Sequence, residues 1–220
     1  MSHCKEWKNA ASFVADALMP GPHQCFICDE EDLIGDDGLC DACRAKLKYY
    51  PAPICSQPLD GITIGLQYCD EIAAAVLRFK KYDMPEYASF LAQFLSVPKD
   101  WNADILVPVP IHPLKLFLRH MQNHTASLAA YLSHATGIPY SGELLTKTRF
   151  TREQKSLKDP ALRRRNIRGS FEADPLAKGL RIVLVDDVFT TGATVYECAR
   201  VLKQSGAAAV YLSAVTSPPH

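Results

Sequence analysis

One segment combines acidic, hydroxyl and glycine residues directly after a predicted buried strand. Arg181–Asp186 is apolar and β-branched, which is typical of a buried strand, and Asp186 and Asp187 stand at its carboxyl end. A helix is predicted over Ala193–Ser205. The short loop at the start of that helix contains Thr190, Thr191, Gly192, Ala193 and Thr194. This order places hydroxyls and free backbone N–H groups next to two carboxylates.

These residue types suit a sugar phosphate. Backbone N–H groups and the positive end of a helix dipole favour phosphate, and Gly192 allows close approach of the backbone. The carboxylates of Asp186 and Asp187 can accept hydrogen bonds from ribose hydroxyls, with Mg²⁺ as the expected mediator toward phosphates. A simple Asp/Thr helix cap is the alternative, but a cap needs one such residue. Glycine patterns of P-loop enzymes and dinucleotide-binding proteins do not occur in the sequence.

A second cluster consists of two Cys-x-x-Cys units, formed by Cys25, Cys28, Cys40 and Cys43. Two such turns can complete the tetrahedron that Zn²⁺ takes at structural sites. Four reduced thiols or a redox dithiol are the alternatives, and His23 can replace one ligand. Since four thiolates leave a zinc site negative, we expect the seven acids within 29–41 to point to solvent. Cys4, Cys69 and Cys198 are expected to be ordinary thiols.

Taken together, these segments resemble a known family. Val183–Thr194 resembles the phosphoribosyl-pyrophosphate (PRPP) signature of type I phosphoribosyltransferases. The wider pattern is similar to the ComF/GntX family, a zinc ribbon plus a phosphoribosyltransferase-like domain associated with DNA uptake in natural competence. Besides the cysteines, the resemblance rests on Phe79–Tyr82, Val107–Pro113, Arg149 with Gln154, and Asn166–Phe171.

The resemblance implies roles for individual residues. Asp186 and Asp187 would hold the ribose of PRPP, and Thr190–Thr194 its 5′-phosphate, with Mg²⁺ present. Lys80 and Arg119 are candidate catalytic cations for the pyrophosphate side, with a solvated side chain as the alternative for each. Apart from the resemblance, three histidines without an assigned partner are candidates for acid–base work, with a surface or capping role as the alternative: His112, His120 and His124.

The sequence departs from the family pattern at two places. The family's second ribbon often begins Cys-x-x-Cys-Gly-x-Pro-Leu, and Ala52–Leu59 has Ala52 at the first ligand position. Cys55 therefore looks like a remnant, and we predict one zinc. The family's Arg-Gly-Phe-Asn-Gln motif stands here as Arg119–Asn123, in which the arginine is present and the rest is changed.

Charge is distributed unevenly along the chain. The 24 basic and 24 acidic residues cancel, which excludes a uniformly basic nucleic-acid binder and leaves a local basic face open. Nine bases lie within 147–168, against Glu153 and Asp159. They can form a basic lid over the site, as the resemblance implies, a contact to single-stranded DNA, or a solvated helix. The candidate nucleic-acid contacts are Arg163, Arg164, Arg165 and Arg168.

Strands alternate with helices through most of the chain. This alternation predicts an α/β fold with a mostly parallel central sheet flanked by helices. The predicted strands are Ile62–Tyr68, Asp104–Val107, Leu144–Thr148, Arg181–Asp186 and Ala208–Val215. The predicted helices are Ile72–Tyr82, Glu86–Leu95, Ala126–Ala135 and Ala193–Ser205. We assign residues 1–22 to an amphipathic helix, 23–60 to the zinc-ribbon-like module and 61–220 to the phosphoribosyltransferase-like domain.

No apolar run approaches the ~20 residues that cross a bilayer, so no membrane insertion is expected. The N-terminus lacks the pattern of a secretory signal, and paired cysteines suit a reducing cytoplasm, which is the predicted localisation. The first hypothesis is a ComF-like protein that binds PRPP or a related ribose 5-phosphate and is a candidate phosphoribosyltransferase. The alternatives are a non-catalytic single-stranded-DNA-binding accessory of the competence machinery, and a PRPP-sensing regulator without turnover.

Overall fold

The computed structural model describes residues 24–30, 34–50, 54–82, 84–119, 123–151 and 160–219. Seven of these residues are described by their backbone alone, namely Ile54, Cys55, Tyr82, Arg119, Pro160, Arg163 and Arg164. The chain divides into two compact units, Met1–Lys46 and Leu47–His220. The helix predicted over 1–22 lies outside the described residues. Residues 54–60, which the prediction gave to the zinc module, form β1, a turn and the start of β2 in the second unit's sheet.

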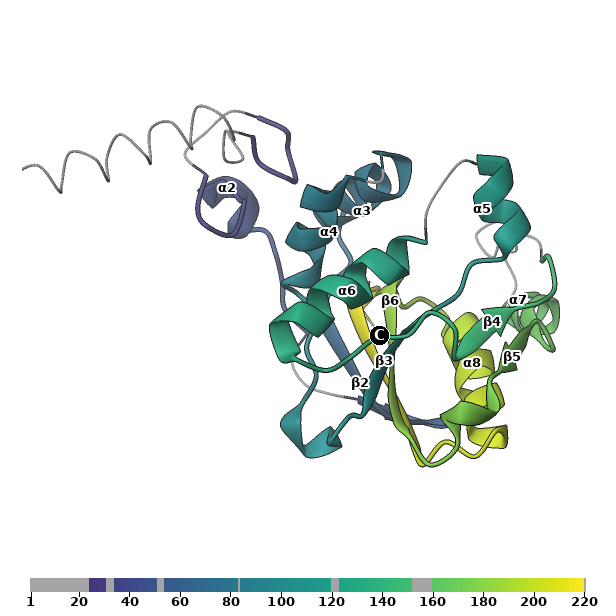
Figure 1. The fold of residues 1–220 in the computed structure, drawn as a ribbon. Helices are drawn as coiled ribbons and strands as arrows, with labels where there is room; N and C mark the ends of the chain where they lie inside the picture. The colour runs from purple at the N-terminus through teal and green to yellow at the C-terminus, as the bar shows by residue number, and fades with distance from the viewer. Residues whose placement is uncertain are drawn as a thin grey trace, which may run out of the picture. The chain divides into compact units, whose positions relative to one another are not determined.

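The second unit is built on a five-stranded sheet of order β1-β2-β7-β6-β3 (Figure 1). Its strands are β1 (Ile54–Ser56), β2 (Leu59–Gln67), β7 (Ala209–Ser217), β6 (Arg181–Val188) and β3 (Ile105–Pro108). All neighbours pair in parallel except β1, which is antiparallel to β2 at the edge. The prediction of a mostly parallel sheet is therefore confirmed. The central strands are largely buried on both faces, as parallel strands covered by helices must be.

Helices cover both faces of this sheet. The described helices of the unit are α3 (Asp70–Tyr82), α4 (Pro85–Ala92), α5 (Pro113–Arg119), α6 (His124–Thr136), α7 (Pro160–Ile167) and α8 (Ala193–Gln204), with short 3-10 turns η1 (Lys99–Trp101) and η3 (Pro175–Ala177). Helix α6 packs on β3 and β6 beside α4, which in turn contacts α3. Helix α8 packs on β7 and contacts α7 (Figure 1). Because side chains alternate along a strand, Ile182 and Leu184 of β6 share the core with α8.

A small two-stranded sheet lies apart from the main one. Strands β4 (Leu145–Lys147) and β5 (Phe171–Ala173) pair antiparallel, so the strand predicted over 144–148 exists but does not join the parallel sheet. Buried Leu145 and Phe171 connect this pair to the core that contains α8. The pair therefore fixes both ends of the connection 148–170, which contains most of the bases of 147–168, to the body of the domain.

We expect Gly65→Ala to destabilise the second unit. A Cβ at this position in β2 would collide with the carbonyl oxygen of Phe94 and lie 2.8 Å from its Cβ, and backbone atoms cannot move aside easily. Overpacking of this kind costs roughly 1–3 kcal/mol. Chemical denaturation should show the loss, whereas the control Gly142→Ala, which adds a methyl in open space, should change little. Equal midpoints for both variants would contradict this packing.

Candidate functional site: a four-cysteine cluster and a phosphate loop

The four predicted ligands lie together in the first unit. The sulfur atoms of Cys25, Cys28, Cys40 and Cys43 all lie within 4.8 Å of one another. The Sγ atoms of Cys28 and Cys40 are 3.9 Å apart, close to the ~3.8 Å separation that a tetrahedron with ~2.3 Å Zn–S bonds requires. The geometry and the donor set therefore fit a structural zinc site. In the part of the chain that the structure describes, this is the one such cluster.

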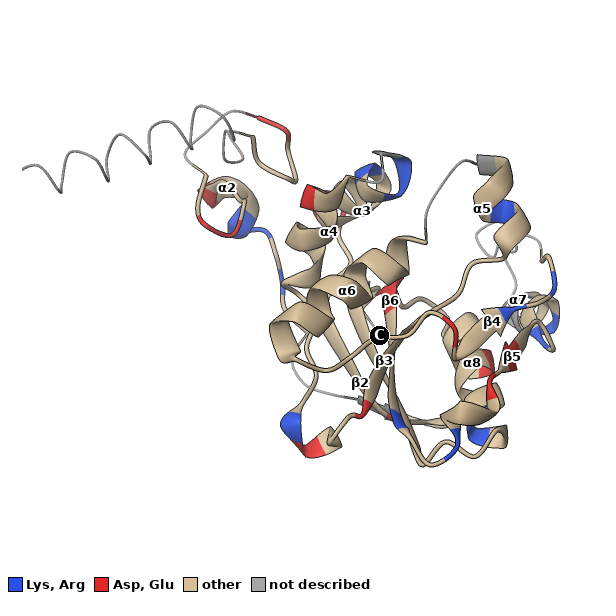
Figure 2. Ribbon diagram, viewed as in Figure 1, with Lys and Arg blue, Asp and Glu red and all other residues tan. Residues whose placement is uncertain are grey.

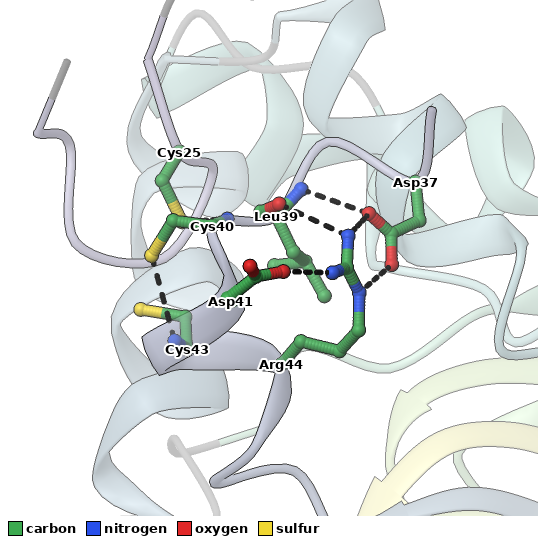
Figure 3. Close-up of polar contacts among 7 residues, drawn as sticks. All are labelled: Cys25, Asp37, Leu39, Cys40, Asp41, Cys43 and Arg44. Atoms are coloured by element: carbon green, nitrogen blue, oxygen red, sulfur yellow. Dashed lines mark hydrogen bonds and ion pairs between the residues drawn. The ribbon is translucent and has the colours of Figure 1, made fainter. Parts of the chain in front are cut away.

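Backbone N–H groups support the sulfur atoms. The N–H of Cys40 donates to Cys25 Sγ (3.5 Å), and the N–H of Cys43 donates to Cys40 Sγ at the start of α2 (Asp41–Arg44; Figure 3). Burial would raise the pKa of Cys25, but N–H groups of Cys28, Cys40 and Ile27 together lower that pKa to about 7. Burial and the neighbouring sulfurs raise the pKa of Cys43. A bound cation would offset the free-energy cost of ionising four thiols that lie so close together.

Arg44 stabilises the turn that precedes Cys40 by hydrogen bonds. Its guanidinium donates to both carboxylate oxygens of Asp37, at 2.8 and 2.7 Å, and also to the Leu39 carbonyl (Figure 3). The same guanidinium donates to Asp41. Asp37, one of the acids of 29–41 that were expected to point to solvent, is partly exposed and also pairs with a base just beyond the acidic run. The Arg44 hydrogen bond lowers the pKa of Asp37.

The remaining cysteines lie elsewhere. Cys198 of α8 is buried in the core, and burial raises its pKa well above the usual value. Cys69 is half-buried just before α3. Cys4 and Ala52 lie outside the described residues, and for Cys55 only the backbone is described.

We predict that Cys40→Ser removes most of the bound zinc. The change leaves three thiolates and also weakens the cap of α2, since the N–H of Cys43 donates to the Cys40 sulfur. Elemental analysis of the purified chain should fall from about one zinc to a small fraction of that. Cys69→Ser is the matched control and should retain the metal. Equal zinc contents in the two variants would contradict the assignment of the ligands.

In the second unit, the loop between β6 and α8 is open at the start of the helix. The N-cap position is Gly192, which has φ +70° and no side chain, so the Asp/Thr cap considered above is not what begins α8. A pocket is lined here by Asp186, Val188, Phe189 and the residues 190–195. The N–H groups of the first turn of α8 therefore lie at the pocket rather than under a capping side chain.

Tyr196 packs against Gly192 of this loop. Its N–H donates to the Gly192 carbonyl (2.7 Å), and a Cβ on Gly192 would collide with its ring. The Tyr196 hydroxyl lies 2.9 Å from Ser56 Oγ on β1. The ring also packs edge-on against Phe189, whose N–H donates to the Thr216 carbonyl on β7. Contacts with two strands of the sheet, β1 and β7, thus hold the loop in place.

The two predicted acids lie beside a lysine from another element. Lys80 Nζ of α3 lies 2.7 Å from Asp187 Oδ2, and the carboxylate is buried. The N–H of Asp187 donates to Asp186 Oδ1 (2.9 Å). Burial alone would lower the pKa of Lys80, but the Asp187 charge outweighs it and the pKa is raised. Burial, together with the charge of Asp187, raises the pKa of Asp186 to about 7.

The structure therefore brings Lys80, Asp186, Asp187 and the loop 190–194 to one end of the sheet. For Arg119, at the end of α5, only the backbone is described. His112 lies outside this group, with its Nδ1 accepting the N–H of Leu114 (3.1 Å). His120 lies outside the described residues, and His124 is buried against Phe79.

The basic segment contains both structural and exposed cations. Arg149 Nη2 donates to the carbonyls of Asn166 (2.9 Å) and Arg168 (2.7 Å), so it holds the end of α7. Arg165 and Arg168 are exposed, whereas for Arg163 and Arg164 only the backbone is described. Sequence reasoning missed Glu197, because a lone acid in a helix gives no signal. Its Oε1 accepts the N–H of Gly169 (2.6 Å) and it pairs with Arg200.

We expect Asp186 to make stability depend on pH. Its folded-state pKa of about 7 lies above the ordinary ~3.9, so its protonated form contributes stability below pH ~4 that is lost as pH rises through about 7. Thermal melts of wild type should fall more steeply from pH 5 to 8 than those of Asp186→Asn. For a chain of this length, each ~1 kcal/mol of change in the free energy of unfolding shifts the melting temperature by roughly 2–4 °C. Parallel profiles would contradict the raised pKa.

Comparison with known proteins shows to which family the chain belongs. A model of the double zinc ribbon domain matches residues 14–73. The DNA utilization protein YhgH of Salmonella typhi is 36% identical over 223 residues, which cover 88% of this chain and 96% of that protein. The chain belongs to the ComF/GntX family. The family also accounts for the similarity to Competence protein F of Haemophilus influenzae, 25% identical over 83% of this chain and 92% of that protein.

Parts of two solved phosphoribosyl enzymes are similar to this chain. The glutamine PRPP amidotransferase of B. subtilis is 28% identical with a TM-score of 0.36, over 57% of this chain and 24% of that chain. The hypoxanthine-guanine phosphoribosyl transferase of L. donovani is 12% identical with a TM-score of 0.36, over 64% and 83% of the two chains. Within the described residues, this ComF/GntX member has no helix with the length and apolar character of a membrane span.

Proposed function

We propose that the chain binds PRPP or a related ribose 5-phosphate together with Mg²⁺. The observation that carries this proposal is the open loop Thr190–Thr194 at the start of α8, with Gly192 at the N-cap and two acids at the end of β6. The loop N–H groups and threonine hydroxyls would bind the 5′-phosphate. The carboxylates of Asp186 and Asp187 would accept hydrogen bonds from the ribose hydroxyls.

Lys80 provides a positive charge within the proposed site itself. Its ammonium offsets the charge of buried Asp187, so the acid pair does not carry two unpaired charges. Mg²⁺, when bound with the ligand, supplies positive charge for the pyrophosphate oxygens. Lys80 and Arg119 are then the proposed cations on the pyrophosphate side.

Transfer of the ribosyl group would need little covalent help from the protein. A nucleophile would form a bond to C1 of the ribose while the C1–O bond to pyrophosphate breaks, and the electron pair would leave with pyrophosphate. Positioning and electrostatic stabilisation then supply most of the rate. A PRPP-sensing regulator would use the same binding site without this step. Pyrophosphate release in the presence of acceptor bases separates the two: release above the base-free rate indicates a transferase.

Calorimetry with PRPP and MgCl₂ tests the binding. Thr191→Val removes one donor hydroxyl while keeping its volume, and we expect it to weaken binding by roughly 10- to 100-fold, the loss typical of one hydrogen bond to a charged group. Asp187→Asn should weaken binding by at least as much. Glu172→Gln, which removes a charge on exposed β5, is the control and should leave the affinity unchanged. An absence of heat with wild type, or equal affinity in all three variants, would overturn the proposal.

A second candidate function is binding of single-stranded DNA. Exposed Arg165 and Arg168 favour it, as do the names of the relatives, DNA utilization protein and Competence protein F. Reduced cysteines would suit such a role in the cytoplasm, beside the DNA-uptake machinery. The contact would be mainly to phosphates, and therefore sensitive to salt.

We predict that replacing Arg163, Arg164 and Arg165 together by Ala weakens DNA binding and reduces its salt dependence. Each lost phosphate contact on a single strand lowers the slope of log K against log salt by about 0.7. Arg181→Ala, an exposed cation at the start of β6, is the control. Binding that does not change with salt would argue against this function.

A further inference from the structure

The loop between the two Cys-x-x-Cys units is connected to both of them by backbone hydrogen bonds. Its ends, Ile34 and Cys40, pair as an antiparallel bridge. The N–H of Phe26, which lies within the first unit, donates to the Gly38 carbonyl (3.1 Å). The N–H of Cys40, at the end of the loop, donates to the sulfur of Cys25. The shape of this loop therefore affects how the two halves of the cysteine cluster lie relative to each other.

The guanidinium of Arg44 packs against this loop. It donates to both carboxylate oxygens of Asp37, and its Nη2 also donates to the carbonyl of Leu39, the residue that precedes the third ligand (3.2 Å). A Cβ on Gly35 would collide with Arg44 Nη2, so the absence of a side chain there leaves room for the guanidinium. Because Arg44 belongs to α2, which also contains Cys43, one side chain links the loop to the helix that holds the last ligand.

The charge of Arg44 is matched by carboxylates. Asp37 and Asp41 both form ion pairs with it, so its single positive charge is shared between two acids. Figure 2 shows acidic and basic residues together at α2. In Figure 3 the guanidinium points toward the two carboxylates, while the sulfur atoms of Cys25 and Cys40 lie on the other side of the backbone. This arrangement suits a role in fixing the turn rather than in neutralising the thiolates.

We propose that Arg44 is a positioning residue for the zinc site, which holds the loop and α2 in the arrangement that the metal requires. The proposal rests on the fit of the four cysteines to zinc and is independent of the ligand of the second unit. Ligands are rarely in place in an unfolded segment, so the cost of gathering them is subtracted from the free energy of binding. A fork of two parallel hydrogen bonds fixes direction as well as distance, which an ammonium group cannot do. Arg44 thereby lowers this cost without contacting the metal.

Competition for zinc between the full chain and a chelator of known affinity measures this contribution. The zinc-loaded protein is kept reduced and titrated with the chelator, and the zinc dissociation constant follows from the metal transferred. We expect Arg44→Gln to raise that constant by roughly 10- to 100-fold, the loss typical when a group that supports metal ligands is removed. Arg44→Lys keeps the charge without the fork, so its loss should fall in the same range. Wild-type affinity in Arg44→Lys would show that charge alone matters and would overturn the proposal.

Two neighbouring acids of the same turn provide a matched control. Asp37→Asn and Asp36→Asn each remove one negative charge, but Asp37 accepts the fork of Arg44, whereas Asp36 is an exposed residue. We expect Asp37→Asn to weaken zinc binding by roughly tenfold or more and Asp36→Asn to change it little. Equal losses in the two variants would show that these acids act through their charge, which would contradict a positioning role for the pair.

Cobalt-loaded protein shows whether the ligand set itself survives. At saturating Co²⁺, visible absorption reports tetrahedral coordination by thiolates, and Arg44→Gln should reach the wild-type bands at higher metal concentration. Loss of these bands at saturation would mean that Arg44 is required to form the site at all, which would overturn a positioning role. Equal zinc affinity of wild type and Arg44→Gln would overturn the proposal while the assignment of the four cysteines stands. A wild-type chain that binds no zinc would overturn both.

Discussion

The ion pair between Lys80 and Asp187 is the contact on which the organisation of the proposed site depends. A carboxylate buried at the end of a parallel strand is costly unless a cation meets it, and α3 brings that cation from a distant part of the sequence. The pair ties α3 to β6 and so fixes one wall of the site. Burial and the charge of Asp187 raise the pKa of Asp186 to about 7, although the charge of Lys80 lowers it.

The two units differ in which charged groups lie close together. In the first, a bidentate Arg44 neutralises Asp37 beside a cluster of thiols that fits a cation. In the second, acids gather at the end of β6 and cations gather around Lys147. The net charge of zero is therefore a sum over regions of opposite sign. This separation is consistent with one neutral chain having both a metal site and the proposed phosphate site.

The sequence predicted the features that repeat or that follow a strong local pattern. Long apolar strands such as β6 and β7, the helices α3 and α8, and the four-cysteine cluster all carry such signals. It did not predict β1, β5, α5 or α7, because segments of three to eight residues show at most a weak period; β4 and α4 are equally short and were predicted. The partnership of Lys80 with Asp187, and the support of the loop by Tyr196 and Ser56, depend on contacts between distant residues. Local patterns contain no information about those.

The central claim is that the end of β6 and the loop before α8 form a sugar-phosphate site. A crystal structure of the full chain grown with PRPP and Mg²⁺ tests it most directly. The account predicts the 5′-phosphate against the N–H groups and hydroxyls of Thr190–Thr194, with the ribose hydroxyls at Asp186 and Asp187. PRPP bound elsewhere, or an empty loop under conditions that saturate binding in solution, would contradict it.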